Sequence, residues 1–233
     1  VDVGNSNTTV GLFNGTGELL FRALLETSRS KTRDQCAIEL LGVFQLYGAD
    51  ACTVDGAILS SVVPPLTTIF TDAIARLTGI PPMVVGPGIR TGLNIKAEIH
   101  NQLGSDIVAS SVAAIAKYPS PIVMVDMGTA TSLSLIVGSV YEGCIIMPGL
   151  ALALDALSER AAALPPISIE TASPVGLMGH TTEEAMRSGV LYGHASMVDG
   201  MLERIEESIG QSVTTVATGG NAPRILRYCK RPI

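Results

Sequence analysis

Apolar and polar residues alternate near the start of the chain in a pattern that predicts paired strands. Residues 8–26 read TTVGLFNGTGELLFRALLE, two apolar runs joined by NGTG at 14–17. An Asn-Gly pair between two such runs is a strong hairpin signal. Further strands are predicted at 54–66, where the strand ends in a loop at Pro64 and Pro65, and at 82–86.

Apolar residues at helical spacing predict five helices, because one face of a helix recurs every three to four residues. These helices span 33–48, 66–79, 103–119, 149–164 and 183–210. Gly79 closes the second helix, and Ser105 and Asp106 lie where the third is capped. Residues 121–149 return to strands, and 213–221 form a last strand with a glycine turn. The pattern predicts a mixed α/β protein.

The most informative pattern is an internal repeat. VDVGNSNTTVGL at position 1 and VDMGTATSLSLI at position 125 each place Val-Asp-x-Gly before small polar residues and an apolar strand. Two such copies, each at the start of a region of strands and then helices, predict two similarly built halves. The matched pairs are Asp2 with Asp126, Gly4 with Gly128, and Asn7 with Thr131.

Each copy carries chemistry suited to phosphate. A glycine after a strand lets the backbone turn tightly and approach a ligand, and hydroxyl, amide and backbone N–H groups can donate to phosphate oxygens. A carboxylate beside them repels phosphate unless a cation lies between. We therefore expect Asp2 and Asp126 to face Mg²⁺, its waters or another cation. The alternative is that each aspartate only caps its turn.

Composition narrows the class of protein. The 233 residues carry a net charge of −6 and are 47% hydrophobic, enough for one large domain or two small ones. Basic residues form no block, which argues against nucleic acid as a partner, and no apolar run reaches the roughly 18 to 20 residues of a membrane span. The four scattered cysteines, without a C-x-x-C pair, indicate reduced thiols in a cytoplasmic protein. P-loop, G-x-G-x-x-G and H-E-x-x-H motifs are missing.

Eight segments occur in the order seen in the type III pantothenate kinases, a family that the chain resembles over nearly its whole length. The segments are DVGNSNT, LSSVVPPLT, GSD, DMGTATS, IIMPG, ERAAALP, GHTTEEAMRSGVLYG and ATGGNA. That family belongs to the acetate kinase, sugar kinase, heat-shock 70 and actin superfamily. The resemblance implies two duplicated ribonuclease H-like domains, at 1–117 and 118–233, with ATP in the cleft between them. It also implies a homodimer that phosphorylates pantothenate to 4'-phosphopantothenate, the first step of coenzyme A synthesis.

The resemblance also assigns nucleotide and metal residues. Asp2 and Asp126 would serve as metal ligands, with Asp126 holding a monovalent cation, K⁺ or NH₄⁺, used alongside Mg²⁺. The residues expected to bind ATP are Asp2, Val3, Gly4, Asn5, Ser6, Asn7, Thr8, Thr9, Gly128, Thr129, Thr131, Gly219 and Gly220.

On the acceptor side, the family's Gly-x-Asp-Arg motif falls on Gly104, Ser105, Asp106 and Ile107. Asp106 would be the general base that orients the acceptor hydroxyl and takes its proton. Its structural alternative is a cap or dipole partner of the helix that it begins. Thr182 matches a threonine that approaches pantothenate across the family's dimer interface.

Two substrate positions depart from the family pattern. Ala97 stands where the family has a tyrosine, and Ile107 where it has an arginine that suits the carboxylate of pantothenate. Lys96, His100 and Arg160 are candidates for a replacement charge. Two hypotheses follow: a kinase acting on pantothenate or a related alcohol, and a regulator of the same fold that binds nucleotide without catalysis. ADP release with and without pantothenate discriminates them.

Overall fold

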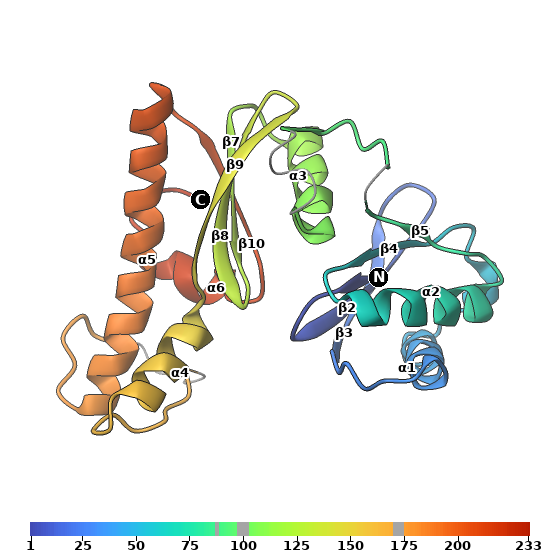
Figure 1. Cartoon of the computed structure of the whole chain (residues 1–233), viewed down its shortest axis with the longest axis horizontal. Coiled ribbons are helices and arrows are strands. Elements are labelled where there is room, and N and C mark those ends of the chain that lie inside the picture. Colours follow the sequence, from blue (N-terminus) through green and yellow to red (C-terminus); the bar gives the residue numbers. More distant parts are fainter. Residues whose placement is uncertain (87–88, 97–102, 170–174) are drawn as a thin grey trace. The chain divides into compact units, whose positions relative to one another are not determined.

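The structure, a computed structural model, describes residues 1–86, 89–96, 103–169 and 175–233. The chain forms two compact units, each with its own five-stranded sheet (Figure 1). The first unit comprises Val1–Thr91 and Ala97–Val112, and the second comprises Gly92–Lys96 and Ala113–Ile233. The predicted mixed α/β class is confirmed. The predicted boundary after residue 117 stays a prediction.

The first unit has a sheet of order β3-β2-β1-β4-β5. β1 pairs antiparallel with β2 and parallel with β4, and the β2–β3 pair is the hairpin expected from the NGTG turn. Its elements are β1 (Asp2–Val3), β2 (Asn7–Phe13), β3 (Leu19–Glu26), α1 (Arg33–Leu46), a 3₁₀ turn η1 (Ala51–Thr53), β4 (Ile58–Ser61), α2 (Pro64–Thr78), β5 (Met83–Val84) and the start of α3 (Ser105–Lys117).

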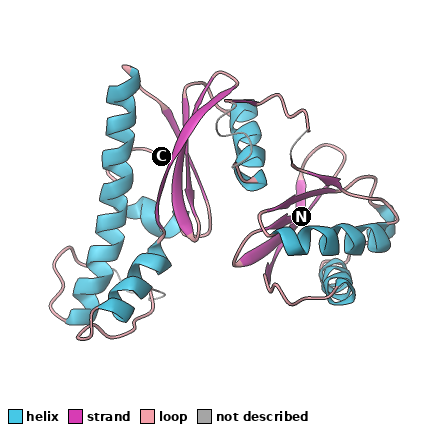
Figure 2. Cartoon of the chain, in the orientation of Figure 1, coloured by secondary structure: helices cyan, strands magenta, loops and turns pink. Residues whose placement is uncertain are grey.

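Helices α1 and α2 cover one face of this sheet (Figure 2). Val3 and Leu59 from the central strands are fully buried in one cluster with Cys36 of α1 and with Leu66 and Phe70 of α2. Burial of these side chains, at about 1.5 to 3 kcal/mol each for the larger ones, stabilises the layer that carries the end of β1.

The second unit has a sheet of order β10-β7-β8-β9-β6. α4 and α5 contribute to its core together with β7 and β8, through residues such as Val125, Leu133, Leu154 and Val198. Its elements are β6 (Asn94–Ile95), β7 (Ile122–Met127), β8 (Ala130–Val137), β9 (Val140–Pro148), α4 (Leu150–Arg160), α5 (Thr182–Ile209), β10 (Thr214–Thr218), α6 (Ala222–Ile225) and a 3₁₀ turn η2 (Leu226–Tyr228).

The internal repeat is a repeat of topology. In the second unit β9-β8-β7-β10 has the order and directions that β3-β2-β1-β4 has in the first: three antiparallel strands and then a parallel one. Asp2 lies opposite Ser60 on the parallel neighbour, and Asp126 lies opposite Thr218 in the same way. The two aspartates therefore occupy equivalent places, each on the strand that has an antiparallel neighbour on one side and a parallel neighbour on the other.

One detail of the predicted repeat is wrong. The sequence match paired Asn7 with Thr131, but the strand register pairs Val3 with Thr8 and Met127 with Thr131. Thr8 is therefore the structural equivalent of Thr131, because the first turn holds one residue more than the second. A fixed offset between two sequence copies cannot reveal an inserted residue.

The remaining differences concern short elements and one helix start. Pro64 and Pro65 were expected in a loop, but they begin α2, where a proline needs no hydrogen-bond partner for its nitrogen. Gly79 ends that helix in the left-handed conformation, φ 75°, as expected. The two-residue strand β6 and the four-residue helix α6 were missed, since neither is long enough to show a period.

Candidate active site

The first strand-end turn, residues 4–7, joins β1 to β2. The Gly4 N–H donates to the Asn7 carbonyl at 3.0 Å, and a Cβ atom at Gly4 would lie 2.9 Å from that oxygen. A side chain at this position would therefore push the turn open. Asn5, Ser6 and Asn7 are exposed. The turn presents amide and hydroxyl groups to solvent, and these are donors suited to phosphate oxygens.

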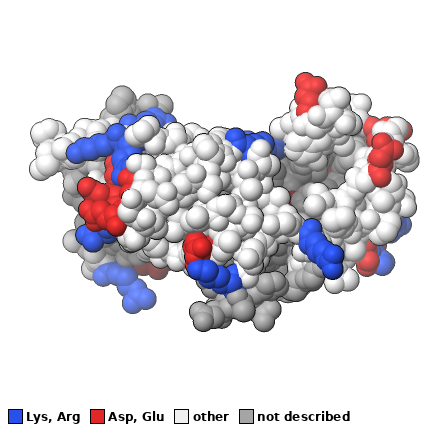
Figure 3. All heavy atoms as spheres, turned by 90° about the horizontal axis from the view of Figure 1, so that it is seen from above, with Lys and Arg blue, Asp and Glu red and all other residues white. Residues whose placement is uncertain are grey.

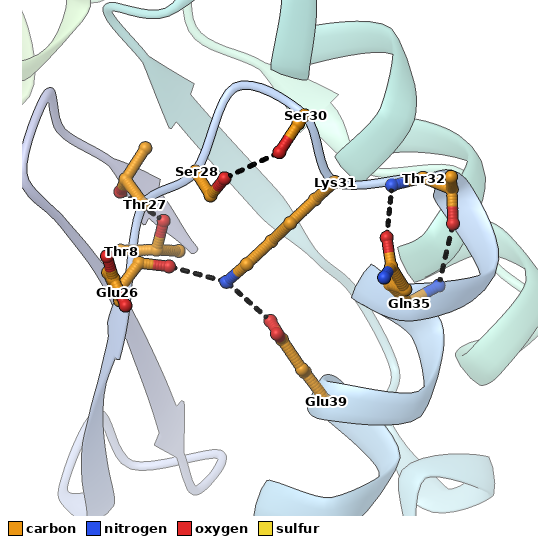
Figure 4. Close-up of polar contacts among 9 residues, drawn as sticks. All are labelled: Thr8, Glu26, Thr27, Ser28, Ser30, Lys31, Thr32, Gln35 and Glu39. Atoms are coloured by element: carbon orange, nitrogen blue, oxygen red, sulfur yellow. Dashed lines mark hydrogen bonds and ion pairs between the residues drawn. The ribbon is translucent and has the colours of Figure 1, made fainter.

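The segment after β3 contacts this turn and the strand that follows it; Figure 4 shows Thr27 of that segment beside Thr8. The buried Thr8 hydroxyl lies 2.8 Å from the Thr27 hydroxyl, and the Thr27 N–H donates to the Ser6 carbonyl at 3.0 Å. Val3 is also buried. The side chains of Val3 and Thr8 are therefore buried, and the two residues are paired with each other in the sheet, so they support the turn from β1 and β2.

Two further contacts hold the same segment in place, and Figure 4 shows both. The Lys31 ammonium donates to the Glu26 carbonyl and pairs with Glu39 of α1 at 2.9 Å. Thr32 and Gln35 form a reciprocal capping box at the start of α1. The segment between β3 and α1, which contacts the first turn, is therefore held in place by its own contacts with Glu39 and with the start of α1.

The Asp2 carboxylate belongs to β1 at the edge of this turn. It is exposed, with Thr9 opposite on β2 and Ser60 opposite on β4. An exposed carboxylate beside phosphate-binding donors matches the expected position of a cation ligand.

Asp106 lies in the first turn of α3, as predicted, and is half-buried. Burial raises the pKa of its carboxyl above the ordinary value, the Ile107 N–H that donates to Oδ1 at 2.8 Å lowers the pKa less, and the charge of Asp2 raises it again. Asp2 and Asp106 are thus within electrostatic range of each other in the first unit. A carboxylate with a raised pKa is a stronger base, which suits the predicted role.

In the Gly104-Ser105-Asp106 segment, steric contacts explain why position 104 is a glycine. A Cβ atom at Gly104 would lie 2.3 Å from Asp106 Oδ1 and 3.3 Å from Val62 Cγ1. Only a residue without a side chain leaves room for the carboxylate, which folds back toward the start of the helix. The Ser105 hydroxyl bonds to the backbone of Ser61, at the end of β4.

The second strand-end turn, residues 128–130, repeats the arrangement in the second unit. The Gly128 N–H donates to the Ala130 carbonyl at 3.0 Å, and Thr129 is exposed. Gly219, with φ 94°, packs directly on β7: a Cβ atom there would lie 2.5 Å from the Met127 carbonyl carbon and 2.6 Å from Asp126 Oδ1. The structure therefore brings Gly219, Gly128 and Asp126 together. Gly220 is exposed beside them.

Thr131 is fully buried, and its hydroxyl lies 2.8 Å from His194 Nε2 of α5. Burial lowers the pKa of His194, so the imidazole is neutral at pH 7. The Thr131 hydroxyl therefore joins the second turn to α5. His194 is 63 residues from Thr131 in the chain, and neither its spacing nor its neighbours in sequence indicate this partner.

Asn221 and Arg224 are two polar residues near the second turn that sequence reasoning missed. Asn221 donates from its backbone to the Met127 carbonyl at 3.0 Å and from Nδ2 to the Gly128 carbonyl at 3.3 Å. Its Oδ1 accepts from Arg224 Nη1 at 3.1 Å. Asn221 thus links the glycine pair to the strand-end turn. Its position directly after Gly219 and Gly220 was the available signal.

The predicted acceptor residues are spread among different places. Ile107 is half-buried next to Asp106, and Ala97 lies outside the described residues. Thr182 is the exposed first residue of α5, next to the capping residue Thr181, whose Oγ1 accepts from the Glu184 N–H at 3.1 Å. Within the described residues Thr182 belongs to the second unit and Asp106 to the first.

The three candidates for a replacement charge have different surroundings. Lys96 forms an ion pair with Glu142, which offsets its charge locally. Arg160 is exposed at the end of α4. His100 lies outside the described residues.

Metal binding at either aspartate would need oxygens from elsewhere. In the ranges that the structure describes, His, Cys, Asp and Glu side chains form no group of three that could hold a metal. The exposed Asp2 carboxylate nevertheless supplies hard oxygen donors of the kind that Mg²⁺ prefers, and Mg²⁺ usually keeps waters and substrate phosphates as its other ligands. The donor set of the first unit therefore fits Mg²⁺ bound together with a phosphate substrate.

The surface carries charges of both signs. On the face drawn in Figure 3, lysine and arginine side chains occur in several separate places among acidic and uncharged residues. Among the described helices, none combines the length and the apolar character that crossing a membrane requires.

Comparison with known proteins identifies the family. The type III pantothenate kinase family model matches residues 1–204. A type III pantothenate kinase from Exiguobacterium sp. strain ATCC BAA-1283 / AT1b is 38% identical over 231 residues, which cover 99% of this chain and 89% of that protein. The resemblance found in the eight motifs is confirmed.

Solved structures agree on the fold. The activator of the 2-hydroxyisocaproyl-CoA dehydratase from Clostridium difficile with bound ADPNP has a TM-score of 0.54 at 11% identity, covering 97% of this chain and 82% of that one. Component A of the (R)-2-hydroxyglutaryl-CoA dehydratase of Acidaminococcus fermentans reaches 0.55 at 12% identity, covering 97% and 85%. Both support the duplicated ribonuclease H-like architecture. By its sequence and its fold, the chain belongs to the type III pantothenate kinase family.

Proposed function

We propose that this protein transfers the γ-phosphoryl group of ATP to the primary hydroxyl of pantothenate, giving 4'-phosphopantothenate and ADP, the first step of coenzyme A synthesis. The observation that carries the proposal is the Asp106 carboxylate, which is held at the start of α3 beside Asp2, in the unit that carries the first phosphate turn. The relative from Exiguobacterium, matched along 99% of this chain, is named for the same activity.

The two strand-end turns are the proposed phosphate-binding parts. Each is closed by a glycine N–H; the first exposes Asn5, Ser6 and Asn7, and the second exposes Thr129. The activator from Clostridium difficile, which shares the fold, has ADPNP bound, and this supports a nucleotide as the ligand proposed here. Val3, Thr8 and Thr131 contribute backbone contacts or support, because their side chains are buried. The predicted cleft for ATP involves both units and stays a prediction.

Phosphoryl transfer asks the protein mainly for position and for neutralised charge. The Asp106 carboxylate accepts a hydrogen bond from the acceptor hydroxyl and takes its proton as the new O–P bond forms and the bond to ADP breaks. The proton then passes from the Asp106 carboxyl to solvent. The raised pKa of Asp106 favours this transfer, since the carboxylate holds a proton more readily than an exposed aspartate does.

Two cations complete the proposed nucleotide site. Asp2 would hold Mg²⁺, directly or through water, and Mg²⁺ would supply the positive charge that the phosphates need. Asp126 would serve a monovalent cation, K⁺ or NH₄⁺. In each place the carboxylate precedes a turn with an exposed polar side chain, and a carboxylate beside bound phosphate would repel it without a cation.

The dimer and the compartment are part of the proposal. Leu177 and Met178, a few residues before Thr182, expose 65% and 77% of their surface. Such exposed apolar side chains beside a predicted substrate residue favour contact with a second copy of the chain. A cytoplasmic location is supported by four free cysteines, since disulfides are rare in that compartment.

A changed acceptor is the second candidate, and Ile107 favours it. An isoleucine next to the proposed base cannot pair with the carboxylate of pantothenate, and a charged hydrogen bond is worth about 1.5 to 3 kcal/mol. A regulator without catalysis would have no use for the base.

ADP release with Mg-ATP tests these alternatives, with pantothenate and with a panel of related alcohols that lack its carboxylate. We expect release that depends on pantothenate. If an alcohol without the carboxylate supports as much ADP release as pantothenate does, the enzyme uses another acceptor. If no acceptor supports ADP release, the regulator is favoured. If pantothenate proves weakly bound, Ala97→Tyr with Ile107→Arg should tighten its binding by about tenfold in calorimetry.

A further inference from the structure

Ser105 lies between Gly104 and the proposed base, and its hydroxyl is occupied by the neighbouring strand. Ser105 Oγ donates to the Ser61 carbonyl at 3.0 Å and accepts from the Ser61 N–H at 2.9 Å. The Ser60 hydroxyl lies 3.2 Å from the same oxygen. A serine hydroxyl has one hydrogen to donate and two lone pairs to accept, so these three contacts exhaust it and make Ser60 the donor of the third.

Strand β4, to which Ser105 is hydrogen-bonded, is paired with β1, the strand that carries Asp2. β4 pairs with β1 in parallel, the Ser60 N–H donates to the Val1 carbonyl at 2.9 Å, and the Val62 N–H donates to the Val3 carbonyl at 3.0 Å. The Ser105 hydroxyl bonds to Ser61, between these two backbone contacts. Ser60 is 7% exposed, so the bonds are shielded from water.

We propose that Ser105 is a positioning residue: by bridging the N–H and carbonyl of Ser61, its hydroxyl docks the start of α3 onto the end of β4 and sets where the Asp106 carboxylate lies. This rests on the proposed function, because it assigns Ser105 a role toward the base of that reaction. It replaces the substrate contact predicted for this serine, whose hydroxyl has no bonding capacity left for a substrate.

The geometry explains why one hydroxyl matters for the base one residue later. The Gly104 carbonyl accepts from the Val108 N–H at 3.1 Å as the helix begins, and the missing side chain of Gly104 leaves room for Asp106 Oδ1. Among the described residues, the hydrogen bonds between the helix start and β4 all involve the Ser105 hydroxyl. Without the Ser105 hydroxyl, two backbone groups of Ser61 need water instead, and the helix start loses its anchor.

The test compares three Ser105 variants with a control in the same helix. Ser105→Ala removes the hydroxyl, Ser105→Thr keeps it, and Ser105→Cys keeps the shape with a weaker donor. Ser110→Ala is the matched control, because it makes the same change one and a half turns further along α3. Turnover and KM for ATP and for the acceptor are measured on the full chain, and amide hydrogen exchange reports on Ser61.

We expect Ser105→Ala to lower kcat by about tenfold or more, since a misplacement of about 1 Å can cost a hundredfold, with KM for ATP within about twofold. Ser105→Thr should restore most of kcat, Ser105→Cys should be intermediate, and Ser110→Ala should match the wild type. The Ser61 amide should exchange faster in Ser105→Ala alone. If Ser105→Ala fails to fold, the order of the threonine and cysteine variants decides.

Three results would overturn the role. Unchanged kcat in Ser105→Ala with faster exchange at Ser61 would show a contact without consequence for the base. A KM for ATP that rises in step with the loss of kcat would indicate general loosening of the unit. Equal turnover of the threonine and cysteine variants would exclude the hydroxyl as the cause. A wild-type protein that releases no ADP with any acceptor would instead overturn the proposed function itself, and with it this role.

Discussion

At the scale of single residues, two titratable groups are held away from their ordinary pKa values by burial. For Asp106 burial raises the pKa, and for His194 it lowers the pKa. In both, the neutral form is favoured by the fold. The two groups therefore change the stability of the fold with pH in opposite directions. Asp106 becomes charged when it loses its proton, whereas His194 becomes charged when it gains one.

Replacing Asp106 by asparagine should stabilise the protein at pH 7 while removing the base. The folded-state pKa of Asp106 lies above the unfolded value of about 3.9, so its stabilising contribution is complete below that pH and is lost as pH rises through the folded-state pKa. Asparagine keeps the shape and stays neutral. Thermal melts of both proteins without nucleotide or metal should show a higher Tm for Asp106→Asn at pH 7 and a smaller difference toward pH 4. A lower Tm at pH 7 would mean that the carboxylate is a helix cap, not a strained base.

His194 should make the fold sensitive to mild acid. Its folded-state pKa is lowered, so the unfolded chain takes up a proton at a higher pH than the folded chain does, and stability falls as pH drops below the ordinary value of about 6.5. In His194→Asn the fall in Tm between pH 7.5 and 5.5 should be smaller than in the wild type. His180→Asn is the control, because His180 is exposed. Equal pH dependence in His194→Asn and the wild type would remove His194 as the cause.

At the scale of elements, the two adjacent glycines near the second turn differ in whether the fold leaves room for a side chain. Gly219 has a positive φ and touches the backbone of β7, whereas nothing lies within 4 Å of a Cβ atom at Gly220. Both had been assigned to the nucleotide on sequence alone. The structure separates a glycine that the fold requires from one that it leaves free.

Gly219→Ala should therefore be damaging and Gly220→Ala tolerated by the fold. We expect Gly219→Ala to cost about 1 to 3 kcal/mol in the free energy of unfolding, from backbone strain and the contact with Met127, and Gly220→Ala to stay within about 0.5 kcal/mol. Urea unfolding of the two variants measures this difference. ATP affinity lost in Gly220→Ala with unchanged stability would show that the nucleotide itself approaches this glycine closely. Equal stability of the two variants would contradict the packing of Gly219 on β7.

The elements also show what sequence could and could not predict. The NGTG hairpin, the helix that Gly79 closes and the Val-Asp-x-Gly repeat were predictable, because each depends on residues close together in the chain. The contacts of Thr131 with His194 and of Ser105 with Ser61 join residues 63 and 44 positions apart, and no periodicity reports them. The one-residue difference between the two turns was hidden for the same reason: only the partner strand reveals the register.

At the scale of the whole molecule, the chain contains two similarly built units, and a dimer is proposed because Leu177 and Met178 are exposed close to Thr182. If Thr182 serves the site of the partner chain, mixed dimers can restore what two damaged chains lack.

Mixing Asp106→Asn with Thr182→Ala under conditions that exchange subunits should restore activity at limiting pantothenate to about a quarter of the wild-type value, since half of the dimers are mixed and each holds one intact site. ADP release before and after mixing measures this. Asp106→Asn mixed with Asp2→Asn is the control, because both residues belong to the same unit of one chain and no intact site can form. Restoration in the control alone, or in neither mixture, would contradict a site shared across the dimer.

We propose Asp106 as the base of a kinase that phosphorylates pantothenate. The most direct measurement follows labelled γ-phosphate from ATP into pantothenate, with Mg²⁺ and K⁺ present, for the wild type and for Asp106→Asn. The expected result is labelled 4'-phosphopantothenate from the wild type and a loss of turnover of about 10² to 10⁴ in the variant, with ATP affinity kept. Labelled product formed equally by both proteins, or no product from a wild type that binds ATP, would contradict it.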